Sequence, residues 1–547
     1  RSSSEWLMVS ETRLTSSLKS APRSPEIYDE PFFLVWKGAG YGGISLFKGL
    51  LLSATAGILV WTARLRGSSW PAILCCLPLF LLTSAGWLAR PQLWTFLGFS
   101  IFVCLLEYHR KAGSLRLLWL PPLAVLWANL HAGFILSFAL LAAYLVGEPG
   151  ALVNRWSRLG RKEYLLLWVV LAGLVLAAFL TPYPEQFFRT LVASPNLGAA
   201  QSESGKAVGA FTALFNMDWR PTTFRQDRWF YYALGLGASW MLLGWRRFNL
   251  TDFCLLAGLS LMGLKLSRHT SFLFFALVAF LPAYLDTAVM PVVRMVGEKG
   301  RHFGVAVIAV LAATAMIWLA RPIVTTAGFF DLGLREWHYP VRATEFIRQQ
   351  RLPGNLYNTY DWGGYLAWKL YPRYKVFWDG RQDDAAMFRQ GWRVMAGKED
   401  WQAILDRHRV NVVVTRCLTM DTGQRYPLLD RLEQSDQWAL VYADNWSLVF
   451  VRKKAVADDW LQKYRLDKAR IWQTLYSEAR LSVAENRWRY KAWWEMARLD
   501  LRQRRYAEAL NHLEEYLSRS PQGDPVAENY YRMLYPLIRG KGNRDGH

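Results

Sequence analysis

A small set of polar residues interrupts the apolar stretches of this sequence and could bind an anionic group. The set is Arg90 in LARPQ, Asn129 and His131 in WANLHAG, and Lys265, Arg268 and His269 in KLSRHT. Arginine binds a phosphate through its planar fork and lysine binds it as a point charge. Because ionisable groups at membrane depth are costly, they usually face a cavity or one another. We therefore expect the set to surround a phosphate. Each residue taken alone has a simpler interpretation, namely a charged side chain at a helix end that extends into water.

Carboxylates in neighbouring segments could act as a general base on a hydroxyl group. We expect Asp29 and Glu30, in EIYDEPFF, to fill this catalytic role. Glu185 in PYPEQFF and Asp218 in NMDWRP are further acidic residues of the same kind. For His131 taken alone, a hydrogen-bonded structural histidine is the simpler interpretation.

A second polar cluster lies in NTYDWGGYLAWKLYPRYKVFWDGRQD, which runs from Asn358 to Asp383. Asp379 and Arg381 flank a glycine at the end of the strand-like KVFW, a position where loops often carry function. They could bind substrate, or they could form a local ion pair.

The same stretch contains a glycine pair and several rings. Gly363 and Gly364 allow a close backbone approach or a tight turn, and Asp361 could cap the helix that follows. The rings could cover a sugar face or a lipid interface, but packing is the preferred interpretation. They are Trp362, Tyr365 and Trp378.

Hydrophobic runs fill the chain up to about residue 320. The 547 residues are 52% hydrophobic and 20% charged. Runs near 20 residues long are typical of transmembrane helices, and about ten are predicted. They are residues 44–62, 70–88, 93–107, 115–130, 132–147, 164–181, 228–244, 252–266, 270–288 and 303–320.

Other classes of protein are excluded by composition. The net charge of +22 does not indicate a nucleic-acid partner, because much of it lies beside hydrophobic spans. The five cysteines have no disulfide or metal-ligand spacing, and no nucleotide-binding glycine motif is present. The chain opens at Arg1 without a methionine or a signal-peptide pattern, so we expect that it is processed or that its first segment, such as a helix before Arg1, is missing.

Positive charge predicts the topology, because basic loops stay in the cytoplasm. Every second loop is basic if residues 115–147 cross the membrane twice. The outer face then holds residues 1–42, the ARPQ and NLHAG turns, residues 183–227, KLSRH and everything after about residue 321. The basic loop residues are Arg64, Arg66, Arg110, Lys111, Arg116, Arg155, Arg158, Arg161, Lys162, Arg246, Arg247, Arg294, Lys299 and Arg301.

Four regions are predicted: an outer or amphipathic segment at 1–42, a transmembrane domain at 43–320, an extracytoplasmic α/β domain at 321–454, and a helical domain at 455–547. The α/β domain has the strand-like segments NLY, KVFW, NVVVT, ALVYA and SLVFV, and the helix-like WGGYLAWKL and DWQAILDRH. In the last region, WWEMARLDLRQRRYAEALNHLEEYLSRSP resembles a tetratricopeptide repeat, which suits protein docking or packing.

The motifs WANLHAGF, SRHTSFLFF and YNTYDWGGYLAW…YKVFWDGRQD resemble a poorly characterised group of bacterial membrane proteins. That group is similar to the GT-C glycosyltransferases, which take sugars from polyprenyl-phosphate carriers at the outer membrane face. The resemblance covers residues 26–453. GT-C enzymes usually place an acidic residue in the first outer loop after the first helix. That helix is absent from this chain, and only Glu5, Asp29 and Glu30 lie near.

The resemblance implies a multi-pass protein of the bacterial inner membrane with extracytoplasmic C-terminal domains. Its partners would be the lipid bilayer, a polyprenyl-phosphate sugar donor and a protein bound by the helical tail. A divalent metal is compatible with this reaction but not implied. The alternative is a non-catalytic GT-C-like scaffold that docks a larger membrane complex. A transporter ranks third, because no paired internal repeat is visible.

Overall fold

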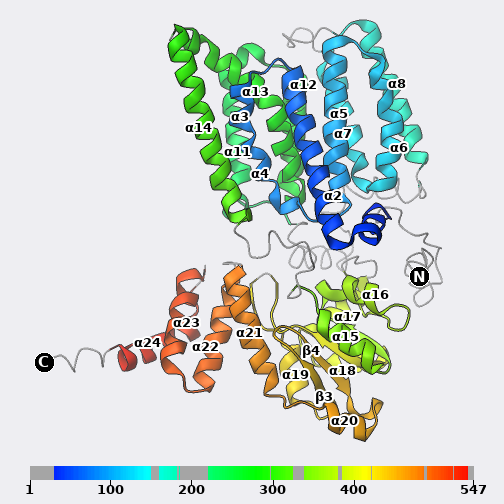
Figure 1. Ribbon diagram of the computed structural model, residues 1–547, viewed down its shortest axis with the longest axis vertical. Coiled ribbons are helices and arrows are strands. Elements are labelled where there is room, and N and C mark those ends of the chain that lie inside the picture. The colour runs from blue at the N-terminus through cyan, green and yellow to red at the C-terminus, as the bar shows by residue number, and fades with distance from the viewer. Residues whose placement is uncertain are drawn as a thin grey trace, which may run out of the picture. The chain divides into compact units, whose positions relative to one another are not determined.

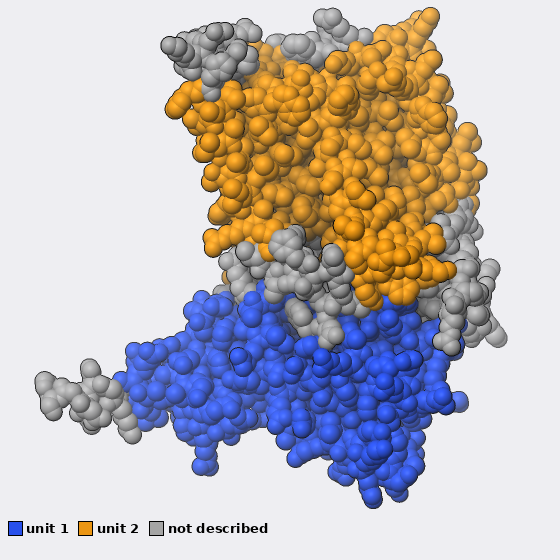
Figure 2. All heavy atoms as spheres, in the orientation of Figure 1, with its two compact units in different colours: residues 1–25, 334–547 blue, residues 26–333 orange. Residues whose placement is uncertain are grey.

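The computed structural model describes residues 30–149, 159–180, 184, 220–295, 297–324, 338–379, 385–420, 422–485, 489–520 and 523–539. These residues belong to two compact units, each with its own hydrophobic core (Figure 2). The first unit along the chain is 26–333, coloured orange and labelled unit 2 in Figure 2, and the second is 334–547, coloured blue and labelled unit 1 together with residues 1–25. The described part of the first unit is helical, and the second combines a sheet with helices (Figure 1).

The first unit consists of α-helices and short 3₁₀ turns. The α-helices are α2 (Glu30–Leu65), α3 (Trp70–Cys76), α4 (Pro78–Leu81), α5 (Gln92–Ala112), α6 (Leu120–Leu130), α7 (Leu136–Gly147), α8 (Arg161–Phe179), α11 (Phe224–Leu243), α12 (Leu250–Lys265), α13 (Thr270–Met295) and α14 (Gly297–Val324). The 3₁₀ turns are η3 (Ser84–Gly86), η4 (Leu115–Trp119), η5 (Ala132–Ile135), η8 (Trp245–Arg247) and η9 (Ser267–His269).

Four helices among the described residues are long and apolar enough to cross a membrane: Pro31–Leu65, Arg161–Phe179, Ser267–Ala288 and Phe303–Arg321. Shorter apolar segments are Trp70–Leu81, Leu115–Leu130 and Ala132–Gly147. Large side chains point outward, with Leu176 at 65%, Ile317 at 71% and Trp318 at 60% exposure. Such a surface suits lipid and not water, so the chain is a membrane protein.

Prolines shape two of the predicted spans. The span predicted at 70–88 is divided into α3 and α4, because Pro78 begins a new helix. In the span predicted at 115–130, the 3₁₀ turn η4 ends at Trp119 and α6 begins at Leu120, just before Pro121 and Pro122. They lie in the first turn of α6, where a missing N–H costs nothing.

Residues 115–147 form two helices that run in opposite directions, as the alternation of basic loops requires. His131 separates them in an extended conformation (φ −165°). It lies beside Thr95 at the start of α5, whereas Glu148, after α7, pairs with Arg110 at the end of α5 (Arg110 Nε to Glu148 Oε1, 3.1 Å). The bundle therefore has two ends, named below the histidine end and the ion-pair end.

The ion-pair end holds five buried charged residues: Arg66, Glu107, Arg110, Glu148 and Asp252. Arg66 NH1 lies 2.6 Å from Glu107 Oε2 and also pairs with Asp252, and Arg110 NH1 lies 3.1 Å from Asp252 Oδ1.

Two tyrosines complete the cluster. Tyr144 donates to Glu107 Oε1 at 2.6 Å, and Tyr284 donates to Asp252 Oδ2 at 2.9 Å. Because its members come from α2, α5, α7, α12 and α13 or their ends, the cluster holds these helices together. Arg66 and Arg110, counted as loop charges in the sequence analysis, are thus buried ion-pair partners.

The second unit places helices around a four-stranded sheet. Its α-helices are α15 (Val341–Gln350), α16 (Gly363–Leu370), α17 (Ala385–Met395), α18 (Trp401–Arg407), α19 (Leu428–Gln434), α20 (Asp458–Tyr464), α21 (Arg470–Glu485), α22 (Lys491–Arg502), α23 (Tyr506–Arg519) and α24 (Pro525–Ile538). The strands are β1 (Asn355–Asn358), β2 (Val410–Thr415), β3 (Trp438–Ala443) and β4 (Leu448–Arg452). The short turns are η11 (Tyr360–Trp362) and η12 (Lys453–Ala455).

The sheet order is β1-β2-β4-β3, with β1 parallel to β2 and the other pairs antiparallel. Four predicted strand segments are confirmed. KVFW is not a strand, because only a single bridge joins Val376 to Leu356. The predicted helices WGGYLAWKL and DWQAILDRH are present as α16 and α18.

The first tail helices pack directly on the α/β core. Trp460 and Leu461 of α20 contact the core cluster around the sheet. Glu478 of α21 accepts from Arg416 Nε at 2.8 Å, from Cys417 N at 2.7 Å and from Leu418 N at 3.3 Å. Residues on both sides of position 454 therefore share one packed interior, and α22, α23 and α24 form a further cluster beyond it.

Burial raises the pKa of Glu478, while the nearby Arg416 pulls it back down. Arg416, only 1% exposed, also meets Asp361 at 2.8 Å (NH1 to Oδ2). Burial lowers the pKa of Arg416, but the two carboxylates overcome this effect and raise the pKa above its usual value. The triad thus depends on all three charges together.

We expect Asp252→Ala to destabilise the first unit strongly, because two buried arginines lose a shared carboxylate. Breaking a buried pair costs roughly 3–5 kcal/mol. The thermal unfolding midpoint of the detergent-solubilised protein should fall by several degrees. Glu345→Ala is the matched control, since it removes an exposed pair with Arg348 that water screens. Equal midpoints for the two variants would contradict the role of the cluster.

Glu478→Gln should loosen the segment that follows β2, because the backbone N–H groups of Cys417 and Leu418 lose a charged acceptor. Hydrogen exchange measured by mass spectrometry should speed up in peptides covering residues 410–420. Exchange in α5 and α13 should not change. Glu508→Gln, on the exposed face of α23, is the control. Unchanged exchange at 410–420 would show that Glu478 does not hold this segment.

Candidate functional site

Most residues predicted to bind the anionic group lie at the histidine end of the first unit. Arg90 precedes α5, Asn129 and His131 stand at the end of α6, Lys265 ends α12, and Arg268 with His269 forms η9. The two ring pairs Phe96–Phe272 and Phe99–Phe272, 5.7 and 5.3 Å between centroids, pack the first half of α5 on the start of α13. This packing brings η9 to the end of the bundle where His131 lies.

The remaining predicted residues are not among those that the structure describes at the histidine end. Asp29, Arg381, Glu185 and Asp218 lie outside the described residues, and Glu30 begins α2 with its side chain not described. Asp379 belongs to the second unit, where its Cα and Cβ lie against Gly363. The gathering of all these residues in one pocket therefore stays a prediction.

His131 is held by an ordered hydrogen-bond network. Its Nδ1 lies 2.6 Å from Thr95 Oγ1 and accepts from Gly133 N at 3.0 Å. Trp127 Nε1 donates to Thr95 Oγ1 at 3.1 Å, so the hydroxyl hydrogen of Thr95 is available for His131. An Nδ1 that accepts two hydrogen bonds carries no proton, which leaves the proton of the neutral ring on Nε2. His131 is thus oriented as a donor through Nε2 and cannot take up a proton at Nδ1.

Gly133 is required by the close packing of this network. A Cβ at position 133 would lie 2.2 Å from Thr95 Oγ1 and 2.7 Å from His131 Nδ1. Both distances are far inside van der Waals contact, so any side chain there would push His131 and Thr95 apart. The glycine of NLHAG therefore serves the geometry of the histidine two residues before it.

Arg268 gives the histidine end positive charge. The guanidinium, half-buried in η9, interacts electrostatically with the rings of both His131 and His269. Lys265 and Arg90 add exposed cations at the ends of α12 and α5. A cation at the same end of the bundle as an Nε2–H donor is suited to binding an oxyanion.

A second arginine at this end is already committed to a carboxylate. Arg220 makes a bidentate pair with Asp227 at 2.6 and 2.8 Å, and its carbonyl accepts from Ser267 N at 2.9 Å. The pair therefore supports the turn that carries Arg268. Thr95, Arg220 and Asp227 were not found in the sequence analysis, because no local motif marks them, and Gly133 was given no role there although it lies in WANLHAG.

Asn129 uses its amide on the backbone. Nδ2 donates to Val125 O at 2.8 Å and, at 3.5 Å, to Leu180 O at the end of α8. These bonds tie α6 to α8, and a role for Asn129 in binding phosphate stays a prediction.

The rings of the second polar cluster pack in the interior, as preferred in the sequence analysis. Trp362 is fully buried and donates to His338 O at 2.8 Å, and Trp378 and Tyr365 are 7% and 8% exposed. Gly363 allows the backbone approach that was predicted, because a Cβ there would lie 2.1 Å from the carbonyl oxygen of Trp378.

The predicted helix cap at Asp361 is wrong. No side chain caps the start of α16, and Asp361 instead pairs with Arg416 at 2.8 Å. The buried guanidinium attracts the carboxylate more strongly than the backbone N–H groups of a helix end would.

Within the described ranges, no group of three or more His, Cys, Asp or Glu side chains could hold a metal ion. The five cysteines are free thiols.

No protein-family model matches the chain, and no curated protein matches it. Among solved structures, it is similar to the Archaeoglobus fulgidus oligosaccharyltransferase tethered with an acceptor peptide that contains the NVT sequon, with a TM-score of 0.49 and 12% identity over 78% of this chain and 65% of that one. The apo form of the same enzyme gives a TM-score of 0.43 and 13% identity over 76% and 64%. The chain thus spans slightly less than two thirds of the length of these structures.

Gly133→Ala should release the His131 ring, because the added methyl group displaces Thr95 and the Nδ1 atom. Ring ¹⁵N spectra of histidine-labelled protein should show the unprotonated Nδ1 of His131 in the wild type and a mixture of tautomers in the variant. The His131→Asn spectrum identifies the signal. Gly258→Ala, at a helical glycine with open space around it, is the control and should leave the spectrum unchanged. A protonated Nδ1 in the wild type would contradict the network.

Proposed function

We propose that the chain is a membrane glycosyltransferase of the GT-C type. It transfers a sugar from a polyprenyl-phosphate-linked donor to an extracytoplasmic acceptor. The observation that supports this most is that an oriented Nε2–H donor on His131 and the guanidinium of Arg268 occur at the same end of a lipid-facing bundle. An oxyanion at the end of a lipid chain would meet both groups while its tail stayed in the bilayer.

In this reaction the acceptor hydroxyl attacks the anomeric carbon of the sugar. The bond from that carbon to the phosphate oxygen breaks, and the electron pair stays on the phosphate. Arg268 and His131 stabilise the charge that grows there, with Arg90, Lys265, His269, Asn129, Asp379 and Arg381 proposed as further donor-binding residues. Asp29 or Glu30 takes the hydroxyl proton, because the His131 network leaves no basic nitrogen on the Nδ1 side.

The location belongs to the proposal as well. The histidine end faces the outside of a bacterial inner membrane, and the second unit is extracytoplasmic. The tetratricopeptide-like tail binds a protein partner. A divalent metal could assist the phosphate, although the proposal assigns no ligand to it.

The alternative is a non-catalytic scaffold subunit of a membrane complex. It is favoured by the pairing of Asp227, a carboxylate at the histidine end, with Arg220, which leaves it unsuited to act as a base. A scaffold would need the buried clusters and the tail but neither His131 nor Arg268.

Transfer of sugar from a synthetic polyprenyl-phosphate donor by the full chain in lipid vesicles tests the proposal. Arg268→Ala and His131→Asn should each lower the transfer rate by roughly 10²-fold, the usual effect of losing one oxyanion donor. Asp29→Ala with Glu30→Ala should abolish it. Lys111→Ala, an exposed cation at the ion-pair end, is the control. Wild-type rates in the Arg268 and His131 variants, with tail deletions disrupting a complex, would favour the scaffold.

A further inference from the structure

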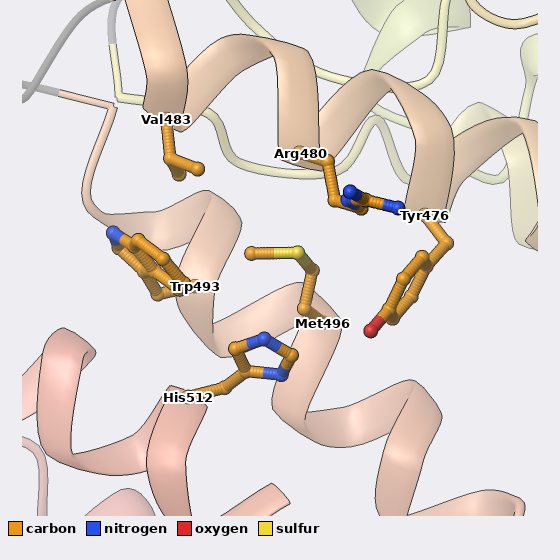
Figure 3. A pocket seen from close by; sticks show the side chains of 6 residues that line it. All are labelled: Tyr476, Arg480, Val483, Trp493, Met496 and His512. Atoms are coloured by element: carbon orange, nitrogen blue, oxygen red, sulfur yellow. The ribbon is translucent and has the colours of Figure 1, made fainter. Parts of the chain in front are cut away.

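The helical tail contains a hollow that the proposed transfer reaction does not involve. Helices α21, α22 and α23 line this open hollow, whose volume is about 290 Å³. Figure 3 shows the side chains that line it: Tyr476, Arg480 and Val483 of α21, Trp493 and Met496 of α22, and His512 of α23.

The interior of the hollow is apolar and aromatic. The ring of His512 lies 5.4 Å from that of Trp493 and 6.2 Å from that of Tyr476, measured between centroids. Met496, 1% exposed, lies between them (Figure 3). Rings and a thioether adapt well to the shape of an apolar side chain.

The acidic residue beside the hollow is already neutralised. Asp500, fully buried, accepts from His512 Nδ1 at 2.7 Å and from Arg505 Nε at 2.9 Å. Since a carboxylate only accepts, Nδ1 of His512 carries the proton and Nε2 is left for another partner. Asp500 therefore does not repel an anion from this site.

Arg480 is the charged group at the hollow that has no counter-ion. It is exposed and forms no ion pair with any residue that the structure describes. Arg505 lies 5.3 Å over the ring of Tyr476, and Arg519 lies 5.5 Å over that of Trp493, so two further cations adjoin the aromatic wall. A carboxylate matches the fork of Arg480 with two parallel hydrogen bonds.

Three of the six lining residues follow one another along α21. Tyr476, Arg480 and Val483 follow one another at i, i+4 and i+7, which spans about 10 Å along a helix. Three residues of an extended chain cover about the same length.

We propose that this hollow binds a short extended segment of a partner protein. In that segment an aromatic or long aliphatic side chain fills the space beside Trp493 and Met496, and an adjacent Asp or Glu pairs with Arg480. The inference does not depend on glycosyl transfer, because it rests on the tail alone.

The test uses the full-length protein in detergent and a set of fluorescent pentapeptides, measured by fluorescence polarisation. The peptides carry Phe, Trp, Leu or Met next to Glu. Matched peptides replace Glu with Gln or Lys, or replace the apolar residue with Ser. At least one Glu peptide should bind saturably, and each matched replacement should weaken it tenfold or more.

Variants locate the binding. Arg480→Glu should lose the Glu peptide and gain the Lys peptide, and Trp493→Ser should bind neither peptide. Arg470→Glu, an exposed arginine at the start of α21, is the control and should bind as the wild type does. Unfolding midpoints show that each variant is folded.

Three results would overturn the proposal. The first is an absence of saturable binding by every peptide of the set. The second is equal binding by wild type and Arg480→Glu. The third concerns competition for the bound Glu peptide. If free glucuronate displaces it at a lower concentration than the Gln peptide does, the hollow is a site for an acidic sugar.

Discussion

Charge inside an apolar helix bundle must meet opposite charge, and this requirement organises the first unit. Arg66 and Arg110 each pair with carboxylates from different helices, so the cluster sets how far each helix slides along its neighbours. Helix α5 contributes Glu107 and Arg110 to this cluster at one end and carries Thr95 at the other. The ion pairs that hold α5 therefore also determine where Thr95 meets His131.

In the second unit, a buried charge is likewise paired with opposite charges where the sheet packs against helices. Arg416 is enclosed at the end of β2, and its charge is met by Asp361 before α16 and by Glu478 on α21. The GG-containing motif and the first tail helices are thereby joined through one guanidinium. Any function assigned to either segment must therefore be compatible with their shared ion pairs to Arg416.

Features that depend on local patterns of residues could be predicted from the sequence. Apolar runs of helical length, the alternating strand segments and the packing role of Trp362 and Trp378 follow from periodicity and residue type. KVFW was misread as a strand because its β-like composition is satisfied by a single bridge and by burial of its rings. Thr95 and His131 are 36 positions apart and Arg416 and Glu478 are 62 apart, so no window of sequence contains either pair. The candidate site could be located near NLHAG and SRH from sequence, but the tautomer of His131 could be assigned only from the hydrogen bonds in the structure.

The ion-pair end has a balanced count of charges once Arg247 is included, since this residue donates to the carbonyl of Arg66. Arg66, Arg110 and Arg247 then stand against Glu107, Glu148 and Asp252. The charges of these six residues sum to zero, and an unbalanced charge in an apolar interior would be costly. A substitution that changes one sign there must await a second that restores the sum, so these six positions are expected to vary between related proteins as linked sets and not one at a time.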